Sequence, residues 1–278
     1  MNGNAVQHPL AKYFRDKINY KTCPGCGNGI TAQAILRAID RSGKSIDDYA
    51  FVSGIGCSGW IPSPFFNTDV LHVTHGRPVA VATGLKIALP DTRIVVIAGD
   101  GDTSAIGGNH FIHAARRNVD ITLITIDNSI YGMTGGQAAP TTPFDSVTAT
   151  TPYGSIERNF DLCRLAEAAG ATFVARWTTY HARQLEESIL HAFEHHGFSF
   201  VDVVSQCPVQ YGKVIGKRND PVSMLMSFKE NSVTKAAAEG KSSEELKGRI
   251  VVGELVNVEG VPELTEEMER IRREVCKQ

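Results

Sequence analysis

The sequence lacks the long apolar run that a membrane-spanning helix requires. No stretch approaches the roughly 18 consecutive apolar residues needed to cross a bilayer. The first ten residues, Met1 to Leu10, also lack the basic segment followed by an apolar segment that is typical of a secretory signal. We therefore expect a soluble, cytoplasmic protein without a membrane partner.

An excess of charge of one sign is missing as well. The chain has 28 Lys and Arg against 30 Asp and Glu, a formal net charge of −2. This balance gives no field to steer nucleic acid or an anionic lipid surface, so we expect no nucleic acid partner. Charged residues make up 21% and hydrophobic residues 42% of the 278 residues, which excludes global disorder and allows one large or two small domains.

Segments of strand length alternate with segments of helix length along most of the chain. This alternation predicts an α/β fold with a doubly wound, mostly parallel sheet. Strands are expected at 50–54, 69–73, 93–98, 121–126, 172–177 and 200–204. Helices are expected at 29–41, 77–89, near 106–117, 161–169 and 182–195.

Two regions interrupt this alternation. Residues 130–157 are rich in Gly, Thr, Pro and Ser, and so long an irregular stretch in a domain is usually functional. After a domain at 1–215, residues 216–278 form a more polar C-terminal extension with a predicted strand at 250–255. We expect this extension to pack on the domain or on a partner subunit through one apolar helical face, formed by Leu264, Met268, Ile271 and Val275.

Polar side chains follow two of the predicted strands. Gly99-Asp100-Gly101-Asp102 ends the strand at 93–98, and Asn128 comes 28 residues after Asp100, about one βαβ unit. If the two strands are parallel neighbours, Asp100 and Asn128 lie at the edge where open α/β sheets bind ligands. Their oxygens suit Mg²⁺, and the glycines allow phosphate to approach the backbone. The alternative is a simple Asp-Gly turn, which the spacing to Asn128 disfavours.

Four of the six cysteines suggest a metal or redox site. Cys23 and Cys26 form a C-x-x-C turn, Cys57 lies in a glycine-rich segment, and Cys207 follows the strand at 200–204. Four thiolates can bind zinc or a [4Fe–4S] cluster, and a C-x-x-C pair alone can act as a redox pair. Spacing leaves all three open.

The other two cysteines, Cys163 and Cys276, lie on helical patterns beside apolar residues. We expect both to pack as small apolar side chains.

A dinucleotide fingerprint is present by letter, with Gly54, Gly56 and Gly59 after a strand. Such a fingerprint has to open a helix, whereas Trp60-Ile61-Pro62-Ser63-Pro64 follows here and cannot continue one. We therefore reject the dinucleotide-binding interpretation.

The motifs together resemble a known family. Gly99-Asp100-Gly101 followed by Asn128 resembles the diphosphate-binding motif of thiamine diphosphate (ThDP) enzymes. The order C-P-G-C-G, G-I-G-C-S-G, T-H-G-R, G-D-G-D and D-N-S-I-Y-G-M-T-G-G-Q resembles the β subunit of 2-oxoacid:ferredoxin oxidoreductases over roughly residues 12–215. Residues Met133 to Pro143 look most like the 2-oxoglutarate enzymes, while pyruvate and branched-chain 2-oxoacids remain open as substrates.

The resemblance implies a site residue by residue. Mg²⁺ would be bound by Asp100, Asn128 and the backbone carbonyl of Ile130. His75 would lie near the cofactor or the substrate carboxylate as a candidate catalytic residue, with helix capping as the alternative. One [4Fe–4S] cluster would be bound by Cys23, Cys26, Cys57 and Cys207. The cofactor contacts would be Ile55, Gly56, Ser58, His75, Gly99, Gly101, Asp102, Gly132, Met133 and Thr134.

The implied activity is oxidative decarboxylation of a 2-oxoacid, with coenzyme A as co-substrate. The resemblance implies an α subunit that carries the pyrimidine domain and its ring-activating Glu, an (αβ)₂ assembly, and external ferredoxin as acceptor, because no second cluster motif is present. Gly135 replaces a Lys that some archaeal members use for coenzyme A, so a contact from this loop is not implied. A non-redox ThDP decarboxylase or carboligase half and a structural-zinc scaffold are the alternative functions.

Overall fold

The computed structural model describes residues 8–16, 18 and 21–277. Most of the first ten residues, which lack the pattern of a secretory signal, lie outside the described part. The strands are β1 Tyr49–Ser53, β2 Val70–His72, β3 Arg93–Gly99, β4 Thr122–Asp127, β5 Phe173–Thr178, β6 Ser199–Val204, β7 Ser232–Thr234 and β8 Ile250–Asn257. The α-helices are α1 Asn28–Ser42, α2 Pro78–Ala88, α3 Gly108–Arg116, α4 Leu162–Ala168, α5 Ala182–Glu194, α6 Gln210–Val214, α7 Pro221–Asn231, α8 Lys235–Ala238 and α9 Leu264–Val275.

One sheet joins all the strands of the described residues, in the order β2-β1-β3-β4-β6-β5-β8-β7. Every pair is parallel except β5–β8, which is antiparallel. Every predicted strand is present, with bounds within two residues of the prediction. The predicted α/β fold with a doubly wound, mostly parallel sheet is confirmed.

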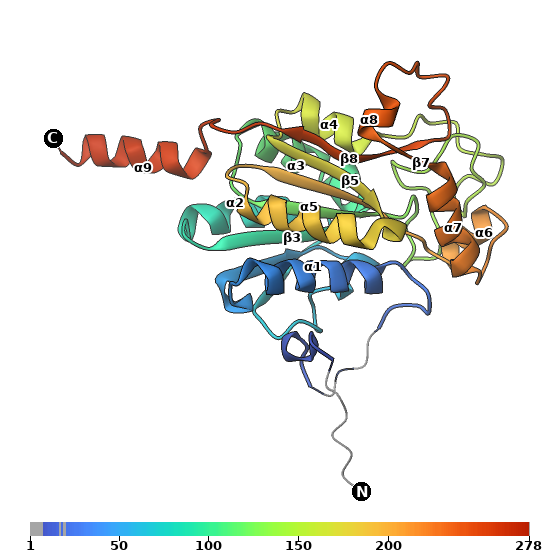
Figure 1. The fold of residues 1–278 in the computed structure, drawn as a ribbon, viewed down its shortest axis with the longest axis horizontal. Coiled ribbons are helices and arrows are strands. Elements are labelled where there is room, and N and C mark those ends of the chain that lie inside the picture. Colours follow the sequence, from blue (N-terminus) through green and yellow to red (C-terminus); the bar gives the residue numbers. More distant parts are fainter. Residues whose placement is uncertain (1–7, 17, 19–20, 278) are drawn as a thin grey trace, which may run out of the picture.

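Helices cover both faces of the sheet, as expected for parallel strands (Figure 1). Helices α1 and α5 pack on each other and on one face, whereas α2, α3 and α4 cover the other. Buried on both sides, β3 has five consecutive buried residues rather than an alternating pattern. Among the described residues, no helix combines the length and the apolar character needed to cross a membrane.

The helix predicted near 106–117 begins later than expected. Asp102–Ile106 forms a π-helical turn, and the regular helix α3 starts at Gly108. Wider turns of this kind occur often at functional sites, because they change the direction of the backbone groups that precede the helix. Here the turn follows directly after the Gly99–Asp102 motif.

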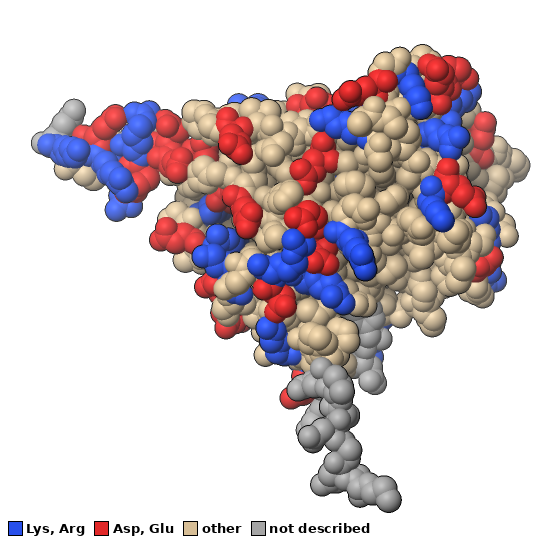
Figure 2. All heavy atoms as spheres, in the orientation of Figure 1, with Lys and Arg blue, Asp and Glu red and all other residues tan. Residues whose placement is uncertain are grey.

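The C-terminal extension continues the sheet. Strand β8 pairs with β5, and β7 pairs with β8. Residues 232–257 therefore pack on the domain at 1–215, which is one of the two expected modes. The domain boundary at residue 215 stays a prediction. Helix α9 projects from the body (Figure 1). Figure 2 shows acidic and basic side chains side by side on this projection.

Only the first turn of α9 packs on the chain. Leu264 contacts the apolar core, but Met268, Ile271 and Val275 are 45%, 51% and 64% exposed. Of the two expected modes for this face, packing on the domain is limited to Leu264, and docking of the remaining face on a partner subunit stays a prediction. For the same reason Cys276 is exposed rather than packed; Cys163 is buried as expected.

Candidate functional site

A pocket of about 310 Å³ lies at the carboxyl edge of strands β1, β3 and β4. Every residue predicted to contact the cofactor or Mg²⁺ lines this pocket, together with two others, Cys57 and Tyr131. The predicted residues come from four separate segments of the sequence, and the parallel sheet brings all of them to one edge. Their roles toward a cofactor stay predictions.

Asp100 and Asn128 meet because β3 and β4 are parallel neighbours, with Gly99 paired to Ile126. Asp100 is 3% exposed and accepts hydrogen bonds from Thr141 Oγ1 at 2.5 Å and from the Gly101 N–H at 2.9 Å. Burial is the main cause that raises the pKa of Asp100 to about 6. A buried carboxylate with no cationic side chain among its hydrogen-bond partners suits a bound metal ion.

The turn after β4 shapes the second half of this candidate metal site. Ser129 has a left-handed φ of 60°, and its N–H donates to Asp127 Oδ1 at 3.0 Å. The Ile130 N–H donates to Asn128 Oδ1 at 3.2 Å. This tight turn brings the Asn128 side chain and Ile130 to the same pocket wall, as the predicted ligand set requires.

Two glycines of the pocket have requirements that only glycine meets. Gly56 has a φ of 143°, and a Cβ at this position would meet no atom within 4 Å, so its backbone faces open space. A Cβ on Gly101 would overlap the ring of Tyr131. Both observations fit a backbone that a ligand approaches closely.

His75 is held by a buried carboxylate. Its Nδ1 lies 2.9 Å from Asp102 Oδ1 and 3.1 Å from the Ile55 carbonyl oxygen. Asp102 is 2% exposed, also accepts from the Gly76 N–H, and has a pKa that burial raises. Helix α2 has Arg77 as N-cap and no side-chain cap, so the capping alternative for His75 is wrong. The carboxylate orients the ring in the pocket, while a direct contact of Asp102 with diphosphate stays a prediction.

The four predicted cluster cysteines line one cavity of about 300 Å³. Cys57, Asn128, Gly132 and Met133 line both this cavity and the cofactor pocket, so the two are neighbours. Within the part of the chain that the structure describes, no three His, Cys, Asp or Glu side chains are grouped tightly enough to hold one metal ion. A [4Fe–4S] cluster requires a cavity between its thiolates, because each sulfur binds a different iron.

The buried surroundings of two of these cysteines disfavour the charged thiolate form. Burial is the main cause that raises the pKa of Cys26 to about 12 and that of Cys57 to about 11. Metal binding at this cavity would therefore release protons.

Gln206, the residue before Cys207, forms hydrogen bonds with the C-x-x-C turn. Its carbonyl accepts from the Gly27 N–H at 3.1 Å, and its Nε2 donates to the Gly25 carbonyl at 3.1 Å. Its Oε1 accepts from Thr179 Oγ1 at 2.5 Å. Through these bonds, cysteines that are far apart in the sequence keep a fixed separation.

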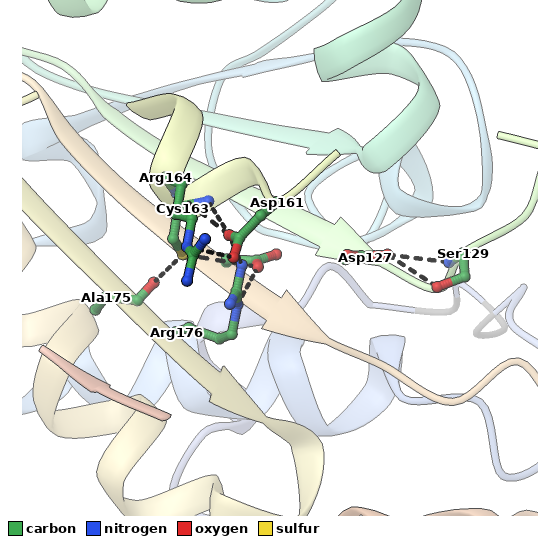
Figure 3. Close-up of polar contacts among 8 residues, drawn as sticks. Asp127, Ser129, Asp161, Cys163, Arg164, Ala175 and Arg176 are labelled. Atoms are coloured by element: carbon green, nitrogen blue, oxygen red, sulfur yellow. Dashed lines mark hydrogen bonds and ion pairs between the residues drawn. The ribbon is translucent and has the colours of Figure 1, made fainter. Parts of the chain in front are cut away.

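Arg176 links β5, β6 and α4 beside the site (Figure 3). It donates from Nε to Asp202 at 2.7 Å and from Nη2 to Asp161 at 2.5 Å. Asp161 also caps α4 by accepting from the N–H groups of Cys163 and Arg164. Although burial opposes it, Arg176 lowers the pKa of Asp161. The Arg176–Asp161 pair therefore anchors the chain just after the irregular segment 130–157, which supplies Thr141.

Comparison with known proteins assigns this site to a family. The model of the thiamine pyrophosphate enzyme C-terminal TPP-binding domain matches residues 54–203. The 2-oxoglutarate synthase subunit KorB of Methanocaldococcus jannaschii is 52% identical, over 95% of this chain and 97% of its own length. The chain belongs to the 2-oxoacid:ferredoxin oxidoreductase β-subunit family.

Other family members agree. KorB of Archaeoglobus fulgidus is 52% identical over 75% of each chain. The structure of 2-oxoglutarate:ferredoxin oxidoreductase from Magnetococcus marinus, with 2-oxoglutarate, coenzyme A and succinyl-CoA bound, matches with a TM-score of 0.84 and 31% identity, over 98% of this chain and 92% of that chain. The family resemblance carried by the motifs is confirmed, and the chain is a subunit of a thiamine diphosphate-dependent oxidoreductase.

Sequence reasoning missed several residues that this β subunit uses to build its site. Tyr131 lies inside the D-N-S-I-Y-G-M-T-G-G-Q motif, but only the structure shows its ring against Gly101. Thr141 lies in the irregular segment that was expected to be functional. Gln206 directly precedes a predicted cysteine ligand, and no pattern singled it out.

Replacing Arg176 with Met should destabilise the fold strongly, because the fully buried carboxylate of Asp202 loses its cation and Asp161 loses its partner. We expect the free energy of unfolding, measured with urea, to fall by about 3–5 kcal/mol. Arg164→Met is the matched control, since Arg164 lies 3.5 Å from Asp161 but its side chain is 77% exposed. The control should change stability by about 0–1 kcal/mol. Equal losses in the two variants would contradict the anchoring role of Arg176.

Proposed function

We propose that this chain is the β subunit of a 2-oxoglutarate:ferredoxin oxidoreductase. The reaction converts 2-oxoglutarate, coenzyme A and oxidised ferredoxin into succinyl-CoA, CO₂ and reduced ferredoxin, and is reversible in principle. The carrying observation is that the Asp100–Asn128 pocket and the four-cysteine cavity share a wall. The name 2-oxoglutarate synthase of the 52% identical relative favours 2-oxoglutarate over pyruvate and branched-chain 2-oxoacids.

The residues of the pocket would hold the cofactor by its diphosphate. Asp100, Asn128 and the Ile130 carbonyl would bind Mg²⁺, and the open backbone at Gly56 would allow close approach. When bound, ThDP supplies an electron sink for the carbanion chemistry at the 2-oxoacid.

His75 is the candidate residue for substrate contact. With Nδ1 fixed by Asp102, its Nε2 makes no hydrogen bond within the described chain and is available to a ligand. The arrangement resembles the general case in which a carboxylate orients an imidazole. A contact between Nε2 and the substrate is the interaction that this geometry favours.

The cysteines would hold one [4Fe–4S] cluster that removes electrons singly. Cys57 contributes to the walls of both the cofactor pocket and the cysteine cavity, which favours a short path between the two groups. Ferredoxin would accept the electrons outside this chain.

An α subunit would complete the active site. The pocket offers groups for the diphosphate and metal, while Ile55 and Met133 at its rim are 42% and 46% exposed. Apolar residues exposed at the mouth of a pocket favour a protein partner. This partner would supply the pyrimidine-binding side and the activating Glu, and two αβ units would pair.

The function is tested by anaerobic co-expression with the adjacent α subunit. The purified complex is assayed with 2-oxoglutarate, pyruvate and a branched-chain 2-oxoacid, each with coenzyme A and a viologen dye as acceptor. We expect the largest kcat/KM for 2-oxoglutarate. A preference for pyruvate would show that pyruvate, and not 2-oxoglutarate, is the substrate. Release of CO₂ without reduction of the dye would favour the non-redox decarboxylase.

Asp100→Ala should remove ThDP binding because it deletes the central carboxylate of the metal site. We expect affinity for ThDP, measured by calorimetry with Mg²⁺, to fall at least about tenfold, equivalent to about 1.4 kcal/mol. Iron content should stay unchanged. Asp91→Ala, at an exposed turn, serves as control. Unchanged ThDP affinity in Asp100→Ala would contradict the assignment.

Cys207→Ser should lose or destabilise the cluster, since serine is a poor iron ligand. We expect iron and sulfide per chain, and the brown absorbance, to fall well below the wild-type level. Cys276→Ser is the control, because Cys276 does not line the cysteine cavity and directly follows α9. Full iron retention in Cys207→Ser would remove Cys207 from the ligand set, and one zinc without iron in the wild type would favour the structural scaffold.

A further inference from the structure

Two segments far apart in the sequence cover the outer side of the cysteine cavity. Residues 21–28 carry the C-x-x-C turn, and residues 207–219 start at Cys207 and fold back on themselves. In the second segment, the Gly212 N–H donates to the Cys207 carbonyl, and the Asn219 N–H donates to the Pro208 carbonyl at 2.8 Å. Lys21 and Gln210 line the cavity from the two segments. The cavity therefore has a rim that both segments build.

This rim is basic in an otherwise balanced protein. The two segments contain Lys21, Lys213, Lys217 and Arg218 but no Asp or Glu, whereas the whole chain has a net charge of −2. Lys213 Nζ bonds to Gln210 Oε1 at 2.8 Å, which holds this cation beside the cavity. None of the four bases belongs to an ion pair of the described residues; Lys21, Lys213 and Arg218 are exposed, and Lys217 is half-buried.

Among the four cysteines of the cavity, Cys23 is exposed and the other three are half-buried. Cys23, Pro24 and Gly25 are exposed, in contrast to the buried Gly27 and Asn28 that follow. The turn does not touch the cofactor pocket, since Cys23 and Lys21 line only the cysteine cavity. A group bound there would be closest to solvent at this turn.

Exposed apolar side chains lie beside the same turn. Pro221, the first residue of α7, packs directly on Gly25, and its neighbour Val222 is 70% exposed. Ile215, between the bases of the second segment, is 40% exposed. An apolar centre with charged residues around it is the usual composition of a small, transient protein interface.

We propose that this basic rim is the docking surface for the acidic one-electron carrier that oxidises the enzyme. The proposal rests on the proposed function, because it needs a redox group at the cysteines. One electron passes from that group through the exposed turn to one oxidised ferredoxin cluster, and no bond or proton moves. Two such encounters remove the two electrons of each 2-oxoacid oxidation. Opposite charges would accelerate each encounter and be screened by salt.

The test uses the assembled αβ complex with Lys217→Glu and Arg218→Glu combined in the β subunit. We expect kcat/KM for a purified acidic 2[4Fe–4S] ferredoxin to fall about tenfold or more at low ionic strength. The wild-type rate should decline with added NaCl, while the variant rate stays nearly flat. Oxidation linked to methyl viologen, a small cation that needs no docking surface, should be unchanged.

The matched control is Lys241→Glu with Lys247→Glu, two exposed lysines in the C-terminal extension that change net charge equally. It should keep the wild-type ferredoxin rate. Carbodiimide cross-linking gives a second readout, with ferredoxin joined to Lys213 or Lys217 of the wild type.

Three results would overturn the proposal. Equal losses in the two charge-reversal pairs would show a net-charge effect. An unchanged ferredoxin rate would show that the carrier docks elsewhere, and failure of the double variant to co-purify with α would show that the α subunit covers this rim. Absence of viologen-linked activity in the wild type would instead overturn the proposed function, and the docking surface with it.

Discussion

The parallel pairing of β3 with β4 is the constraint on which the site depends. It brings a carboxylate and an amide that are 28 residues apart to one edge of the sheet. Asp100 at this edge is buried without a cationic hydrogen-bond partner, an arrangement that costs stability unless a metal ion or a proton neutralises it. The flanking network of Arg176 uses the opposite solution, since there two carboxylates share one guanidinium within the protein. The sheet thus carries one compensated acidic cluster and one that suits a ligand.

Much of this could be predicted from sequence because the signals are local. Buried parallel strands appear as β-branched runs, and strand ends appear as glycine with Asp or Asn, so the fold and the Asp100–Asn128 pair can be predicted from local patterns. The other pocket residues could be predicted only through the family resemblance. The contacts that could not be predicted depend on pairs distant in sequence. Thr141 reaches Asp100 across 41 positions, and Gln206 reaches Gly25 across 181. No sequence pattern predicts which distant residue a side-chain amide or hydroxyl will form a hydrogen bond with.

Helix α9 shows a different limit. Its apolar face is present, but sequence periodicity indicates only that such a face is buried in a contact. It does not indicate whether the contact is with the same chain or with a partner. An isolated helix of twelve residues is marginal in water, so contacts beyond its first turn must come from outside the described chain if it is to be stable. The incorrect expectation that Cys276 is packed has the same origin.

The segment around Cys57 separates the cofactor pocket from the cysteine cavity and belongs to both. A backbone shift of Gly56 to Ser58 would alter the diphosphate side and the thiolate side together, so neither can be adjusted independently. A substitution in this segment would have to satisfy two different chemistries at once, and engineering of the redox potential there would change cofactor affinity as a side effect. Changes confined to one property are better sought on the outer wall, where Cys23 and Lys21 face only the cysteine cavity.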